Sequence, residues 1–189
     1  MANREIAYMK MQLSNAARTG AGSMIHGEGD KTGTYAPANN WIPVYAFDFE
    51  IYAPDVNTIQ CTVPKPVDQK PVRIKKLLHN ATPQLFQAHV SKKGIFNVEF
   101  HITKSSGTEA EAVALKLVGT NGIITRWRTI TEITKGLGGM GGYHESITQF
   151  EEIELVCTAW TVENFKVLKD DKTTVGEYDF QNPNKGKAT

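Results

Sequence analysis

Residues 75–104 read KKLLHNATPQLFQAHVSKKGIFNVEFHITK, and here an otherwise strand-like chain changes to a helical pattern and back. Thr82 and Pro83 suit the first turn of a helix, because a Thr hydroxyl can accept a hydrogen bond from a free backbone N–H and Pro loses none there. Gly94 is the expected left-handed stop. We therefore predict one short helix over about residues 82–93, which must pack on a sheet because it is too short to be stable alone.

The predicted helix has apolar side chains at helical spacing, namely Leu85, Phe86, Ala88 and Val90, of which Phe86 and Val90 lie four residues apart on one face. The residues that follow it alternate between apolar and polar, as in a strand with one buried face. The apolar face of this predicted strand comprises Phe96, Val98, Phe100 and Ile102.

Alternation elsewhere predicts further strands over residues 9–13, 41–52, 113–117, 123–134, 146–162 and 175–180. We expect a brief strand near Met24, a tight hairpin turn at Thr120-Asn121-Gly122, and a bulge near Phe150, where the phase of the alternation shifts. In residues 41–52, Asp48 and Glu50 share the polar face with Val44 and Ala46, opposite an apolar face of Tyr45, Phe47, Phe49 and Ile51.

Six or more antiparallel strands with one helix predict a mainly β fold, namely an antiparallel β-barrel of two packed sheets with one short flanking α-helix. Residues 1–180 form the single expected domain, and residues 181–189 are expected to be a disordered tail. Four prolines within residues 53–71 predict an extended, protruding loop there.

Composition narrows the possible functions. The 189 residues carry a formal charge of +1, which argues against a strongly electrostatic nucleic-acid or membrane binder. No apolar run approaches the length of a membrane span, and the N-terminus has no secretory pattern. Two cysteines are too few for a disulfide framework, so we expect reduced thiols in a cytosolic setting.

No set of residues in the sequence assembles a catalytic or metal site. The five histidines lack the i, i+3 or i+4 partners of a local metal signature, and the glycine loop at residues 136–142 lacks the Lys-Ser/Thr of a P-loop. Arg126 and Arg128 lie on one strand face and are expected to pair with the acidic surface of Glu152 and Glu154, within a subunit or across one. A ligand-binding barrel and a hydrolase with a carboxylate or thiol site remain alternatives.

The order of features resembles the Hcp family (hemolysin-coregulated protein), the tube protein of bacterial type VI secretion systems. The matching helix region is followed by paired strands, the glycine loop, and a final short aromatic strand. The residues that carry the resemblance are Lys76, Asn80, Thr82, Pro83, Leu85, Ala88 and Gly94, then Glu145, Ile147 and Phe150, and finally Tyr178 and Phe180. The early stretches IHGEG and VYAFDFEI also resemble family features.

This resemblance implies a structural protein that is not an enzyme and has no cofactor. Family members form hexameric rings that stack into a hollow tube, which a contractile sheath propels behind a spike. The implied partners are other copies of the chain, sheath proteins, the spike and secreted effectors held in the lumen, with no nucleic acid and no membrane insertion. Assembly would take place in the bacterial cytoplasm, followed by export.

The resemblance also assigns candidate surfaces. The stretch Tyr52–Pro71 matches the family's ring-stacking loop, with candidates Pro54, Asp55, Asn57, Lys65, Asp68 and Lys70. The lumen-facing candidates are Asp48 and Glu50. The candidates for a subunit or sheath interface are His89, Lys92, Arg126, Arg128, Glu152 and Glu154.

Overall fold

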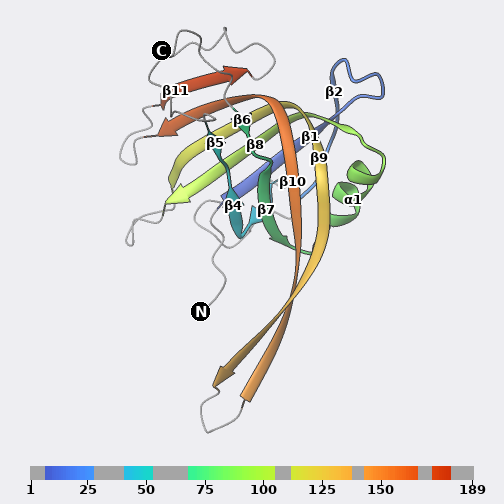
Figure 1. Ribbon diagram of the computed structural model, residues 1–189, viewed down its shortest axis with the longest axis vertical. Helices are drawn as coiled ribbons and strands as arrows, with labels where there is room; N and C mark the ends of the chain where they lie inside the picture. Colours follow the sequence, from blue (N-terminus) through green and yellow to red (C-terminus); the bar gives the residue numbers. More distant parts are fainter. Residues whose placement is uncertain are drawn as a thin grey trace, which may run out of the picture.

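The computed structural model describes residues 7–27, 41–52, 68–104, 112–137, 143–165 and 172–179. Within these ranges the chain forms strands and one short helix (Figure 1). The elements are β1 (Ala7–Ser14), β2 (Ala21–Met24), β3 (Ile42–Val44), β4 (Ala46–Asp48), β5 (Ile51–Tyr52), β6 (Asp68–Gln69), β7 (Val72–Leu77), α1 (Thr82–Val90), β8 (Gly94–Lys104), β9 (Ala112–Leu137), β10 (Tyr143–Phe165) and β11 (Lys172–Asp179). The predicted fold class, mainly antiparallel β with one short helix, is confirmed.

The sheet closes on itself into a barrel. Antiparallel pairing runs from β1 through β8, β9 and β10 to β7. Strand β3 pairs with β1, and β4 pairs with β7. Only Tyr45 separates β3 from β4, and its N–H donates to the carbonyl of Lys75 at 2.8 Å. Residues 42–48 therefore bridge the first and last strands of the sheet, and the two expected sheets are walls of one continuous sheet.

The barrel interior is filled by apolar side chains, because alternate residues of each strand point inward. Phe47, Phe49, Phe100 and Trp160 form an aromatic cluster, in which the rings of Phe47 and Phe100 have centroids 4.8 Å apart. The fully buried aliphatic and thioether side chains around it include Met9, Met11, Ile42, Val44, Val72, Ile74, Val98, Ile153 and Leu155. Val44 was expected on the polar face; it is buried because the chain bends at Tyr45 and exchanges faces.

Helix α1 begins at Thr82 as predicted, but it ends at Val90, three residues early. Its N-cap residue is Ala81, and no side chain caps it. Lys92, with a φ of 50°, takes the left-handed conformation expected of Gly94, which instead starts β8. Helix α1 is therefore short, with nine residues. In the described part of the chain, no helix is long and apolar enough to cross a membrane.

The helix buries only two of its four predicted apolar side chains. Leu85 and Ala88 are buried against the sheet, whereas Phe86 and Val90 are 46% and 63% exposed. A similar change occurs in β8, where Phe96 is 37% exposed and Ile95 is fully buried. The register between β1 and β8 shifts at this point, so a β-bulge turns the Phe96 side chain outward.

Two further sequence expectations are wrong. The turn expected at Thr120-Asn121-Gly122 is absent, because β9 runs through it and Asn121 takes a φ of 51° within the strand. The bulge expected near Phe150 is also absent, since the register with β9 shifts between Glu154 and Leu155 instead. Phe150 interrupts the alternation because it is buried on the outer face, under Tyr45 and Lys75.

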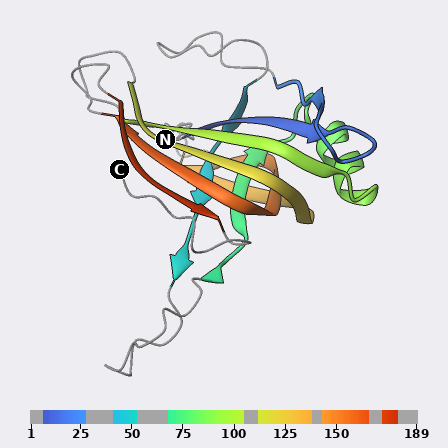
Figure 2. The same ribbon diagram turned by 90° about the horizontal axis from the view of Figure 1, so that it is seen from above.

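Two ribbons lead away from the barrel. Strands β5 and β6 pair with each other as a separate two-stranded sheet (Figure 2), at the base of the expected protruding loop. The far ends of β9 and β10 extend well beyond the other strands (Figure 1). Residues 138–142 of the glycine loop, residues 53–67 and the expected tail lie outside the described residues.

Candidate functional site

Strands β7, β9 and β10 carry an outer charged ladder, which we define as Arg73, Arg126, Arg128, Glu152 and Glu154. Glu154 Oε1 lies 3.0 Å from Arg73 Nη2 and 3.2 Å from Arg126 Nη1. Glu152 Oε1 lies 2.8 Å from Arg128 Nη2. Cross-strand register explains these contacts, since Glu152 is opposite Arg128 and Glu154 is opposite both Arg126 and Arg73.

The arginine side chains of the charged ladder remain partly exposed to solvent. Their side chains are about half exposed, whereas the two glutamates are only 11% and 13% exposed. The hydrogen bond from Arg128 lowers the pKa of Glu152, and the hydrogen bond to Glu152 raises the pKa of Arg128. The glutamates thus hold the half-exposed guanidinium groups in place.

The described lumen and loop candidates lie near the ends of β4, β5 and β6. Asp48 is exposed on β4, opposite Arg73 in register. Glu50 forms an ion pair with Lys70, whose Nζ lies 2.8 Å from Glu50 Oε2. Asp68 belongs to β6, and the remaining loop candidates lie outside the described residues, namely Pro54, Asp55, Asn57 and Lys65.

The candidates on and just after the helix, His89 and Lys92, both form hydrogen bonds with other parts of the same chain. Nδ1 of His89 lies 3.2 Å from the carbonyl of Ile124, which ties α1 to β9. Lys92 follows the helix, and its carbonyl accepts a hydrogen bond from Arg18 Nη2 at 2.7 Å. The side chain of Lys92 is exposed, so it remains available to a partner.

A buried ion pair joins Lys76 of β7 to Glu151 of β10, and both side chains are fully buried. Glu151 also accepts hydrogen bonds from Trp127 Nε1 at 2.6 Å and from the Thr82 hydroxyl at 2.9 Å. Lys76 donates to the carbonyl of Leu77 at 2.7 Å. Since the network joins side chains of β7, β9, β10 and α1, it fixes the start of α1 against the barrel.

Next to this network lies His79. Its Nδ1 accepts a hydrogen bond from the backbone N–H of Ala81, while the buried Nε2 has no hydrogen-bond partner among the described residues. Burial, together with the positive charge of Lys76, lowers the pKa of His79 from 6.5 to about 4. The imidazole is therefore neutral at pH 7.

A second polar cluster lies on the outer face of β8 and β9. Glu99 Oε1 is 2.6 Å from His101 Nε2 and 3.2 Å from Lys116 Nζ. Burial alone would raise the pKa of Glu99, but these two hydrogen bonds outweigh it and hold the pKa at about 2. Trp41 lies over His101, with ring centroids 4.3 Å apart.

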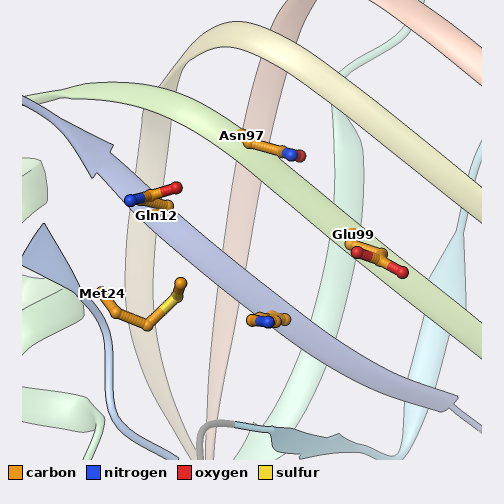
Figure 3. A pocket seen from close by; sticks show the side chains of 5 residues that line it. Gln12, Met24, Asn97 and Glu99 are labelled. Carbon is orange, nitrogen blue, oxygen red and sulfur yellow. The ribbon is translucent and has the colours of Figure 1, made fainter. Parts of the chain in front are cut away.

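The same face has a shallow pocket of about 90 Å³ (Figure 3). Its lining residues come from β1, β2 and β8, and they are Lys10, Gln12, Met24, Asn97 and Glu99. Pockets for drug-sized ligands measure several hundred Å³, so this pocket does not fit the ligand-binding alternative.

The cysteine in the described part of the chain, Cys157, does not favour a hydrolase with a thiol site. Cys157 is buried, and its burial raises the thiol pKa to about 12, which makes it a poor nucleophile. Within the described ranges, no group of three or more His, Cys, Asp or Glu side chains could hold a metal ion. The described surface carries ion pairs and exposed apolar side chains.

Comparison with known proteins identifies the family. The family model described as "Type VI secretion system effector, Hcp" matches residues 8–163. The chain belongs to the Hcp family. No curated protein sequence matches it.

Solved structures show the same fold at low sequence identity. A type six secretion system protein has a TM-score of 0.66 and 16% identity to this Hcp chain, with 97% of this chain and 100% of the other covered. A crystal structure titled Hcp protein has a TM-score of 0.67 at 15% identity, covering 94% and 98%. The secreted protein Hcp3 from Pseudomonas aeruginosa has a TM-score of 0.55 at 18% identity, covering 92% and 98%.

The sequence predicts four of the five residues of the charged ladder in this Hcp chain; it misses Arg73 and the buried network. The expected pairing of Arg126 and Arg128 with Glu152 and Glu154 is present within one chain, and their contact with a neighbouring subunit stays a prediction. Glu151 is next to Phe150, where the sequence predicts a bulge. Its burial could have been inferred from strand alternation, because Glu151 has the same parity as Ile153 and Leu155 and therefore lies on the core face.

Proposed function

We propose that this Hcp chain is a structural subunit of the inner tube of a type VI secretion system. Copies form hexameric rings, the rings stack into a hollow tube, and the lumen holds secreted effectors. Family membership over residues 8–163 carries this proposal. The architecture supports it, because a closed barrel is rigid and its two projecting ribbons offer contact surface beyond the barrel wall.

The partners of the tube follow from this role. Sheath proteins surround the tube, the spike caps its tip, and effectors travel inside it. The chain assembles in the bacterial cytoplasm and leaves through the secretion apparatus. The half-exposed arginines of the charged ladder and the side chain of Lys92 are our candidates for the contacts with neighbouring subunits or with the sheath.

Negative-stain microscopy with a mass measurement tests the ring. We expect particles with a central pore and a mass about six times the 20.9 kDa of one chain. A variant lacking residues 56–68 should keep the rings and lose the stacked tubes, because the segment on the β5–β6 ribbon is the proposed contact between rings. A monomer at every concentration contradicts the ring, and unchanged tubes in the deletion variant contradict the assigned loop role.

A further inference from the structure

The far end of the β9–β10 hairpin extends beyond the strands that flank it. We define the arm as residues 132–137 of β9 and residues 143–148 of β10, which pair with each other. Figure 1 shows the arm leading away from the barrel. Strand β7 pairs with β10 no further than Phe150, and the N–H of Leu78 then donates to the carbonyl of Gln149 at 3.3 Å. A two-stranded ribbon is marginally stable alone, so contacts at the base of the arm decide how firmly it is held.

One side chain of the barrel wall reaches the arm. Lys75 of β7 forms an ion pair with Glu132 of β9, through Nζ of the lysine and Oε1 of the glutamate. Among the described residues, Glu132 is the arm side chain that is ion-paired with the barrel. Strand β10 lies between the two residues, because it pairs with β7 on one side and with β9 on the other. The ion pair therefore joins the arm to a strand that does not pair with it.

Strand register shows that Lys75 extends along β10 to make this contact. The residue opposite Lys75 on β10 is Glu152, which is in turn opposite Arg128 on β9. Arg128 already holds the Glu152 carboxylate, with Nη2 at 2.8 Å from Oε1. Glu132 lies four residues further along β9 than Arg128, towards the arm. The lysine side chain is thus directed away from its own register position and towards the base of the arm.

An aromatic ring supports the Lys75 side chain in this direction. Nζ of Lys75 lies 4.2 Å from the ring centroid of Phe150, within the range of a cation–π contact. Phe150 is only 2% exposed, and the ring of Tyr45 lies against it with centroids 6.1 Å apart. The N–H of Tyr45 donates to the carbonyl of Lys75 at 2.8 Å. Because its backbone and its ammonium group are both held, Lys75 loses less side-chain freedom on pairing with Glu132 than an unsupported lysine would.

The ion pair is open to solvent on one face of the ribbon. The side chains of Lys75 and Glu132 are 24% and 45% exposed, so dissolved ions weaken their attraction. Successive residues of a strand point to opposite faces, which places Glu132 on the face opposite Ile133. The ion pair therefore leaves the exposed side chains of Ile133 and Ile147 uncovered.

We propose that Lys75 and Glu132 form a salt-sensitive strap that fixes the arm to the barrel across β10. With the strap closed, the base of the arm is held on β7. With the strap open, the backbone bond from Leu78 to Gln149 is the last described polar contact between β7 and the hairpin. Ionic strength therefore shifts the arm between a held and a free state. The strap does not depend on assembly of the chain, so its failure leaves the proposed tube function standing.

Hydrogen exchange of the arm amides tests the strap in the full chain. The unmodified protein is compared with Glu132→Gln and Lys75→Met in one assembly state, which a mass measurement establishes for each sample. We expect exchange in the arm to be about 2- to 5-fold faster in Glu132→Gln, the range that loss of one exposed ion pair gives. Lys75→Met should exceed it, since the cation–π contact with Phe150 is lost as well. The double variant K75M/E132Q should match Lys75→Met, because removing one partner already opens the strap.

Arg126→Gln is the matched control. It removes another ion pair between β9 and β10, that of Arg126 with Glu154, but this pair lies outside the arm. The arm amides of Arg126→Gln should exchange as they do in the unmodified chain. Equal arm exchange in the unmodified chain and Glu132→Gln, or the same acceleration in Arg126→Gln, overturns the strap.

Salt provides a comparison that needs no folded variant. Raising NaCl from about 0.05 M to about 1 M should accelerate exchange in the arm of the unmodified chain, because screening weakens the exposed ion pair. The same change should leave arm exchange in Glu132→Gln nearly unaltered. Arm exchange in the unmodified chain that does not respond to salt overturns the proposal.

Discussion

At the scale of single residues, the buried Lys76–Glu151 ion pair joins β7 to β10. Burying two charges is unfavourable unless each is paired and its remaining hydrogen-bonding capacity is used. Here Trp127 and Thr82 supply further donors to Glu151, and the carbonyl of Leu77 accepts from Lys76. The pair therefore ties two strands and the helix start together, and it is sensitive to the loss of either member.

Glu151→Gln should lower the free energy of unfolding by about 3–5 kcal/mol, because it leaves the charge of Lys76 buried without a counterion. Urea denaturation measures the loss. The double variant K76M/E151Q should be more stable than Glu151→Gln alone, since the uncompensated charge is gone. Glu132→Gln is the control, with an expected loss below about 1 kcal/mol, because Glu132 is 45% exposed in its pair with Lys75. Equal losses in Glu151→Gln and Glu132→Gln would contradict this account.

At the scale of elements, β9 is continuous where the sequence indicates a turn. Thr120-Asn121-Gly122 has the composition of a hairpin turn, but β8 and β10 pair with β9 on either side of it. Glycines on this strand allow close packing instead. A Cβ on Gly119 would lie 2.7 Å from Cys157 Sγ and 2.8 Å from the Trp160 ring.

Gly119→Ala should therefore destabilise the protein by about 1–3 kcal/mol through overpacking of the barrel interior. The thermal midpoint, read by circular dichroism, reports the change. Gly20→Ala is the matched control, because the nearest atom to its added Cβ, Asn15 Nδ2, is 3.5 Å away. We expect its effect to stay within about 0.5 kcal/mol. Equal thermal midpoints for Gly119→Ala and Gly20→Ala would contradict this prediction, because they would mean that the barrel interior accommodates the added methyl group without strain.

At the scale of the whole molecule, closure of the barrel depends on residues 42–48, which pair with β1 at one end and β7 at the other. Global unfolding exposes the partly buried titratable groups of the chain to water. Acid stability therefore reports on global unfolding. Two groups have pKa values well below their ordinary range, His79 at about 4 and Glu99 at about 2.

Stability should fall in two steps on acidification. The pKa of His79 is lower in the folded chain than the usual 6.5, so the unfolded chain binds more protons, and stability is lost as the pH falls from about 6.5 towards 4. Glu99 adds a second loss between about 4.5 and 2, a window in which Glu152 also contributes. Urea midpoints at pH 7.5, 5.5 and 4 measure the first step. His79→Asn should remove that step and leave the second, and a midpoint that does not change between pH 7.5 and 4 would be inconsistent with it.

The sequence alone determined the fold class, the helix start and the family. Alternation in residues 9–13 and 96–103 reflects the strand period of two, and Thr82-Pro83 reflects local backbone preferences. These signals are local, so they can be recognised without knowing which elements pack against one another. The charged ladder was also within reach, because alternation places Arg126, Arg128, Glu152 and Glu154 on outer faces.

Only the tertiary structure decided which faces are covered. Phe86 is apolar yet exposed, and Glu151 is charged yet buried, because burial depends on which strand or helix lies opposite and not on the residue itself. The same holds for Asn121, whose turn-like sequence is overridden by strands on both sides, and for the arm, whose length depends on where β7 and β8 end. Long-range pairing sets these outcomes, and no local pattern encodes it.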